Sequence, residues 1–212
     1  LPEAQLDRFL FKLDVGSVRR ETIEQILVER RHGTPPELEA VVSPAELDEL
    51  FAGVDAVFLP RAVANGGDLE ARAHMLVASS MGATAFQKGL GAMHSLSHPC
   101  SANLGTHHGL TNAVVMPYVL EWNRTAIEAK MVRLAAWLGL ADRSFSGVLA
   151  WVLELRREIG IPHTLAEIGV REEHARSFAP QALNDPSTGG NPLPMTEQDF
   201  EQLYGMCIAG KL

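Results

Sequence analysis

From about residue 16 onward the sequence shows helical periodicity, and no run alternates apolar and polar residues as a half-buried strand would. Residues suited to the ends of helices recur along this length. Ser43 and Asp68 stand where N-caps are expected, and Gly139 and Gly160 follow the last apolar residues of two periodic segments. Because 46% of the 212 residues are apolar, the helices can bury a substantial core. We therefore expect a mainly α protein, built as a helical bundle.

The periodic segments predict where the individual helices lie. A long helix rich in alanine, glycine and serine is expected from Asp68 to His98, where small residues would let neighbouring backbones approach closely. The next helix is expected from Leu110 to Trp122, with an interruption at Pro117. Further helices are expected at residues 125–139, 145–158, 164–168, 172–183 and 196–208, with a loop at 185–193.

The N-terminal part has a different pattern. Residues 9–15 form a short apolar run closed by Gly16, which predicts a strand, and two helices are expected after it. A proline at residue 60 and the pair Gly66-Gly67 mark the strongest candidate boundary. The sequence therefore predicts two domains, at residues 1–65 and 66–212, the first a small segment of one strand plus helices.

Charge and cysteine content restrict the class of partner. The formal net charge is −8, whereas nucleic acids and anionic membranes are bound by basic surfaces. We expect neither as a partner, and no apolar run approaches the roughly 20 residues that cross a bilayer. The two cysteines, Cys100 and Cys207, form no CxxC motif, which favours a reducing cytoplasmic location.

Half of the chain's eight histidines fall between residues 94 and 108. His94 and His98 are four residues apart, so on a helix they project from one face, and His108 follows a turn that could return it to the same place. Imidazoles converging in this way suit a divalent transition metal. The alternative is that His94 and His98 are interior residues bonded to backbone carbonyls, while His107 and His108 cap a helix.

The details of this segment narrow the chemistry. The first histidine of HSLSH is not followed by the glutamate of an HExxH motif, so the sequence disfavours a zinc-dependent hydrolase. A metal that acts as a Lewis acid on an alcohol or carbonyl oxygen fits this segment better. Gly89-Leu90-Gly91 lacks the strand of a dinucleotide fingerprint and is interpreted as close packing beside the site. Cys100 could contact a metal, although an isolated cysteine is more often a small buried apolar residue.

From about residue 59 to 212 the chain resembles the C-terminal domain of the iron-containing alcohol dehydrogenase family. The resemblance is carried by LPRAVANGGDLEARAHML, KGLGAMHSLSHP, THHGLTNAVVMPYVL and DPSTGGNPLPMT. It implies that His94 and His108 bind Fe²⁺ or Zn²⁺, and that His98 lies beside the nicotinamide of NAD(P) and the substrate as a catalytic or cofactor-binding residue. His107 is given no ligand role. A small alcohol or aldehyde is the implied substrate.

The chain also departs from this family. In this family two further ligands, an aspartate and a histidine, stand in DxxxH spacing, and no such motif is found upstream of His94. The Rossmann-like domain that holds the cofactor in the family also has no counterpart in this sequence. The resemblance therefore implies metal-dependent, nicotinamide-linked alcohol oxidation or carbonyl reduction by an incomplete unit. We expect the 212 residues to be inactive alone.

Residues 1 to about 65 resemble a different family, the MoxR branch of the AAA+ ATPases. The resemblance rests on LPEAQLDRFLFKLDV, in which Arg8 matches the arginine finger that acts on ATP held by a neighbouring subunit. Walker A and Walker B segments are missing, so this ATPase fragment would not hydrolyse ATP by itself. The chain is thus expected to be a chimera. An ATPase-associated interaction module without catalytic activity is the alternative function, and a homo-oligomer is possible for either.

Overall fold

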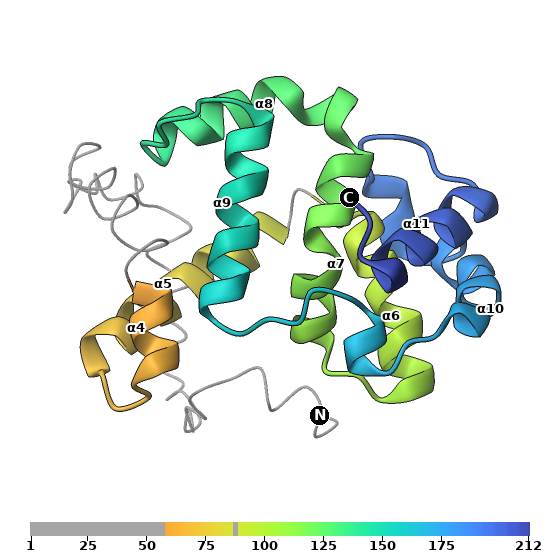
Figure 1. Ribbon diagram of the computed structural model, residues 1–212, viewed down its shortest axis with the longest axis horizontal. Coiled ribbons are helices and arrows are strands. Elements are labelled where there is room, and N and C mark those ends of the chain that lie inside the picture. Colours follow the sequence, from red (N-terminus) through yellow and green to blue (C-terminus); the bar gives the residue numbers. More distant parts are fainter. Residues whose placement is uncertain (1–57, 87–88) are drawn as a thin grey trace, which may run out of the picture. The chain divides into compact units, whose positions relative to one another are not determined.

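The computed structural model describes residues 58–86 and 89–212, which all lie in the second of two units that divide the chain between residues 43 and 44. In this described part the regular structure is entirely helical, without a strand (Figure 1). The prediction of a mainly α helical bundle is therefore confirmed. The predicted strand at 9–15, Arg8 and residues 1–57 of the MoxR-like segment lie outside the described residues.

Ten helical elements follow one another in the described part. They are α4 (Leu59–Ala64), α5 (Leu69–Ala85), α6 (Ala92–Leu104), α7 (His108–Trp122), α8 (Arg124–Trp137), α9 (Phe145–Glu158), the 3-10 helix η3 (Ala166–Ile168), α10 (Glu172–Leu183), the 3-10 helix η4 (Pro186–Gly190) and α11 (Glu197–Ala209). From α7 onward they agree with the predicted segments to within about two residues at most ends, and η4 forms inside the predicted loop.

The long helix predicted from Asp68 to His98 is wrong, because the chain forms α5 and α6 there. Asp68 caps α5 as expected, with its side chain accepting a hydrogen bond from the Ala71 amide. Between the two helices Gly89 has φ +97°, a left-handed conformation that residues with a Cβ rarely adopt, and Gly91 is the N-cap of α6. Helix α6 then continues through Pro99, beyond its predicted end.

Helix α7 links two clusters of buried apolar side chains. The larger cluster lies among α6, α7, α10 and α11, and the smaller one joins α8 and α9 to the other side of α7. Figure 1 shows α6 and α7 running side by side, with α10 and α11 on one side of the pair. The helix that carries two of the candidate histidines is therefore packed on several sides.

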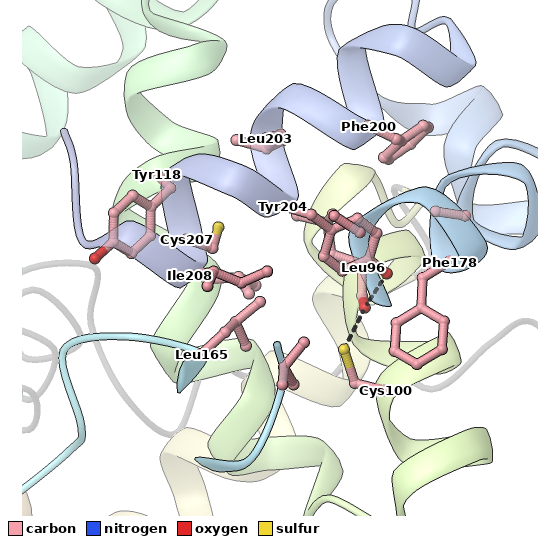
Figure 2. Close-up of a cluster of buried hydrophobic side chains, with 14 of the residues drawn as sticks. Leu96, Cys100, Tyr118, Leu165, Phe178, Phe200, Leu203, Tyr204, Cys207 and Ile208 are labelled. Carbon is pink, nitrogen blue, oxygen red and sulfur yellow. Dashed lines mark hydrogen bonds between the residues drawn. The ribbon is translucent and has the colours of Figure 1, made fainter. Parts of the chain in front are cut away.

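A buried tyrosine ties α11 to α6 inside the larger cluster. The hydroxyl of Tyr204 donates a 2.7 Å hydrogen bond to the carbonyl oxygen of Leu96, and the thiol of Cys100 donates to the same oxygen at 3.3 Å (Figure 2). All three residues have no solvent exposure. Because an unpaired polar group would be costly at this depth, the bonds hold α11 in one position along α6.

The candidate boundary at residues 65–67 is a turn between two helices that contact each other, α4 and α5. Arg61 of α4 forms a 2.8 Å ion pair with Asp68 and another with Glu70. The predicted division into domains at residue 65 stays a prediction. Across residues 58–86 and 89–212, no helix combines the length and the apolar character that a membrane span requires.

Candidate metal centre

Two consecutive helices bring the candidate histidines together. His94 and His98 lie one turn apart on α6, and His108 is the first residue of α7. Gly105 ends α6 in the left-handed conformation, and the side chain of His107 caps α7 by accepting a hydrogen bond from a backbone amide. The chain thus reverses within three residues, and the first turn of α7 faces α6.

The three imidazole rings are neighbours in space. The ring centroids of His94 and His108 are 5.3 Å apart, those of His98 and His108 are 5.2 Å apart, and those of His94 and His98 are 5.8 Å apart. The rings of His98 and His108 are stacked, with 15° between their planes. The structure therefore brings together all three histidines that the sequence singled out.

The Nε2 atoms of His94 and His108 point toward a common position. The amide nitrogen of Asn112, one turn along α7, lies 3.0 Å from Nε2 of His108 and 3.4 Å from Nε2 of His94. Which of these atoms donates depends on the tautomer of each ring. In the tautomers that carry the proton on Nδ1, both Nε2 atoms would offer lone pairs at this position, a donor set that suits a divalent transition metal.

Ser97 determines which ring nitrogen of His108 carries the proton. Its hydroxyl donates to the carbonyl oxygen of His94 at 3.1 Å and lies 3.3 Å from Nδ1 of His108. Because the single hydroxyl proton is used on the carbonyl, the hydroxyl oxygen accepts the Nδ1–H of His108. The lone pair of His108 is therefore on Nε2, the atom directed at the common position.

The surroundings differ on the two sides of the cluster. His94 is buried, and its ring makes a T-shaped contact with the ring of Phe86, with centroids 5.6 Å apart. His98 is open, with 42% of its side chain exposed. An ion held by His94 and His108 would thus be shielded on one side and accessible to a small molecule on the side of His98.

One acidic residue contacts the cluster although no pattern near the histidines predicts it. Nδ1 of His98 lies 2.7 Å from Oδ2 of Asp185, a residue from the loop that precedes η4. Burial by itself would raise the pKa of Asp185, but hydrogen bonds from His98 and Ser187 outweigh it, and the pKa lies below its usual value. The only sequence signal for this contact is that Asp185 belongs to DPSTGGNPLPMT, one of the segments that carry the family resemblance.

The other candidates do not belong to this cluster. Cys100 is buried beneath Tyr204 and Leu96, and burial raises the pKa of its thiol to about 12, so it remains a protonated apolar residue. Within the part of the chain that the structure describes, no three His, Cys, Asp or Glu side chains are arranged to hold a metal. The ligand roles of His94 and His108 and the catalytic or cofactor role of His98 stay predictions.

Comparisons with known proteins agree on one family. The family model described as "Fe-containing alcohol dehydrogenase family, C-terminal" matches residues 53–208. NAD-dependent methanol dehydrogenase from Bacillus methanolicus is 38% identical over 153 residues, which make up 69% of this chain and 40% of that protein. The 4-hydroxybutyrate dehydrogenase of Cupriavidus necator is 36% identical over 154 residues, which make up 68% of this chain and 40% of that protein.

Solved structures show the same relationship. A 1,3-propanediol oxidoreductase superposes with a TM-score of 0.70 at 28% identity, over 82% of this chain and 47% of the other. Alcohol dehydrogenase from Oenococcus oeni gives 0.67 at 27% identity, over 78% of this chain and 46% of the other. The chain thus spans less than half the length of these relatives. With a family match over residues 53–208, this chain belongs to the iron-containing alcohol dehydrogenase family and corresponds to its C-terminal helical domain.

Proposed function

We propose that residues 53–212 form the metal-binding part of a nicotinamide-linked dehydrogenase that oxidises an alcohol or reduces an aldehyde or ketone. The observation that carries this proposal is the convergence of Nε2 of His94 and Nε2 of His108 on one position. Membership of the dehydrogenase family supports it, because redox chemistry on alcohols and aldehydes recurs among the relatives.

Each histidine has a separate role in this proposal. His94 and His108 hold Fe²⁺ or Zn²⁺, both of which accept imidazole nitrogen. When bound, the ion supplies Lewis acidity toward the alcohol oxygen, and the nicotinamide of NAD(P) supplies the hydride acceptor. His98, on the exposed side of the cluster, contacts the cofactor and substrate, while Phe86 packs against the ring of His94.

The proposed unit is incomplete in the 212 residues. Two imidazoles leave a transition metal with open positions and weak binding, whereas catalytic zinc sites commonly have three protein ligands. The chain therefore needs further ligands and a cofactor domain from another polypeptide segment. We expect no alcohol-dependent reduction of NAD(P)⁺ by the 212 residues alone.

The relatives suggest the class of substrate. Most of their names specify a small substrate, as in a methanol dehydrogenase, a lactaldehyde reductase and a 4-hydroxybutyrate dehydrogenase, although one relative is a long-chain-alcohol dehydrogenase. We therefore propose a small alcohol or aldehyde. A cytoplasmic location and a homo-oligomeric state belong to the same proposal.

A fusion enzyme tests the function. Residues 53–212 would replace the matching part of the Bacillus methanolicus methanol dehydrogenase, so that the rest of that protein supplies what this chain lacks. The fusion should reduce NAD⁺ in the presence of a small primary alcohol. Replacing both His94 and His108 with alanine should lower the rate at least about 100-fold, the upper range for loss of outer-shell partners of a metal.

His163→Ala is the matched control, because this histidine is exposed and lies outside the cluster. It should leave the turnover of the fusion unchanged. A folded fusion that turns over equally well without His94 and His108 would contradict the proposed function.

One alternative proposal rests on the resemblance of the N-terminal residues to MoxR-type ATPases. In that case the chain is an interaction module that docks on another ATPase subunit, with Arg8 directed at its nucleotide. A pull-down of a purified MoxR-type ATPase with the 212-residue chain separates the two proposals. Capture that is lost on removing residues 1–52 would favour the interaction module.

A further inference from the structure

The carboxylate of Asp185 and the ring of His98 form a pair outside the set of predicted ligands. They lie 87 residues apart in the sequence, with Oδ2 of the aspartate 2.7 Å from Nδ1 of the histidine. An ionised carboxylate can only accept a hydrogen bond, so the ring nitrogen facing it must be the one that carries the proton. The contact therefore places the Nδ1–H tautomer on His98.

The carboxylate of Asp185 is itself held in place. Its other oxygen, Oδ1, accepts a 2.8 Å hydrogen bond from the amide of Ser187 and caps η4. Only 12% of the side chain is exposed. Both oxygens thus have separate and fixed partners, and rotation of the carboxyl group would break two contacts at once.

The loop that carries Asp185 is docked on the helix that carries His98. The hydroxyls of Thr188 and Ser95 lie 2.8 Å apart, and the amide of Ala92 donates to the side-chain oxygen of Asn191 at 3.2 Å. Because both contacts are made to the first turn of α6, the distance between loop and helix is set independently of the Asp185–His98 contact.

The remaining sides of the His98 ring are also defined. One face stacks on His108, and within residues 58–86 and 89–212 Nε2 makes no hydrogen bond. With the proton on Nδ1, Nε2 presents a lone pair on the exposed side of the cluster. A group with an O–H bond that entered from this side would meet an acceptor.

We propose that Asp185 is a positioning residue, which holds His98 in the Nδ1–H tautomer so that Nε2 accepts a hydrogen bond from the hydroxyl of an alcohol substrate. This inference rests on the proposed function for its substrate, but the Asp185–His98 contact needs no bound metal or cofactor. It gives the aspartate of the DPSTGGN motif a specific role in the site.

Asp185→Asn is a sharp test because it changes one atom. The asparagine oxygen can still accept from the Ser187 amide, which leaves the amide nitrogen, a donor, facing His98. A donor requires a lone pair on Nδ1 and therefore drives the ring to the Nε2–H tautomer. In the uniformly ¹⁵N-labelled 212-residue chain at about pH 9, where ordinary imidazoles are neutral, ring nitrogen spectra report the tautomer directly, and His98→Gln assigns the signals.

The wild-type chain should show Nδ1 of His98 protonated and Nε2 unprotonated, and Asp185→Asn should reverse the two. Asp199→Asn is the matched control, because the carboxylate of Asp199 also accepts a hydrogen bond from a backbone amide at the start of a helix, that of Thr196, and contacts no histidine. It should leave the His98 signals unchanged. Reversal by both variants, or by neither, would overturn the proposal.

If Asp185→Asn does not fold, the wild-type spectrum alone still tests the proposal, because a proton on Nε2 of His98 in the wild-type chain contradicts the proposed role of Asp185. The outcome is separate from that of the proposed function. A chain that binds no metal can still show the Asp185-dependent tautomer, and a chain that binds metal can lack it.

Discussion

The backbone of Gly190 passes so close to that of Leu90 that a Cβ at residue 190 would lie 2.0 Å from the Leu90 carbonyl oxygen. Backbone atoms cannot move aside as a flexible side chain can, so the contact admits only glycine. It joins the loop after α10 to the segment that begins α6. The positions of Asp185 and of the histidines are therefore coupled through one close approach of two backbones.

Gly190→Ala should destabilise the chain, because the methyl group can be accommodated only by moving the loop away from residue 90. We expect a loss of about 1–3 kcal/mol in the free energy of unfolding, the range for an overpacked site. Urea denaturation followed by circular dichroism measures this loss. Gly189→Ala is the control, since no atom lies within 4 Å of its Cβ position, and it should unfold like the wild type. Equal stability of the two variants would show that residues 90 and 190 are not in contact.

Ser97→Ala should weaken metal binding without removing a ligand. The variant loses the acceptor for Nδ1–H of His108, and the ring is then free to change tautomer or rotate. Loss of such a partner typically lowers metal affinity 10–100-fold. Calorimetric titration with Zn²⁺ measures the change. Ser95→Ala removes a buried hydroxyl of the same helix that contacts Thr188 and no histidine, so its affinity should stay at the wild-type value.

Tyr204→Phe should lower the free energy of unfolding by about 0.5–1.5 kcal/mol, because the carbonyl oxygen of Leu96 loses the 2.7 Å hydrogen bond from the Tyr204 hydroxyl in a region without solvent. Thermal and urea unfolding measure the effect. The thiol of Cys100 still reaches the same oxygen, so the double variant with Cys100→Ala should lose more than the sum of the two single variants. A fully additive result would mean that the two donors do not share this acceptor.

Glu167 should make stability depend on pH. The pKa of Glu167 lies below its ordinary value, because the carboxylate accepts hydrogen bonds from the amide and hydroxyl of Thr164 and from the amide of His163. A carboxyl group with a lowered folded-state pKa stabilises the fold above its unfolded-state pKa of about 4.3, and this contribution is lost as the pH falls through the lower value. Glu167→Gln should therefore be less stable than the wild type at pH 7 and approach it below about pH 4. Urea midpoints that differ equally at both pH values would contradict this assignment.

Local sequence patterns were sufficient to predict the positions of those site residues that lie close together in the sequence. The four-residue spacing of His94 and His98 predicts a shared helix face, and α6 carries both in this way. His108 comes back beside α6 because Gly105 ends that helix in the left-handed conformation, a helix ending that is common in proteins. These features follow from residues within one or two helical turns of each other.

Long-range contacts explain what the sequence did not reveal. The sequence around Gly89-Leu90-Gly91 is rich in small and helix-compatible residues, so its composition predicted one continuous helix. The segment just before α6 is instead held by contacts of Leu90 and Ala92 with Gly190 and Asn191, about a hundred residues away, which no local pattern records. Asp185 was missed for the same reason, because only the docking of its loop on α6 brings it to His98.

Calorimetric titration of the 212-residue chain with Zn²⁺, in the wild type and in His94→Ala, His108→Ala and His163→Ala, tests the metal centre most directly. The wild type and His163→Ala should bind one ion with a free energy smaller than the roughly 10–16 kcal/mol of four-ligand structural zinc sites. Each of the other two variants should lose this binding. If the chain binds zinc equally tightly without His94 or without His108, then the two imidazoles do not form a metal site, and the central claim is wrong.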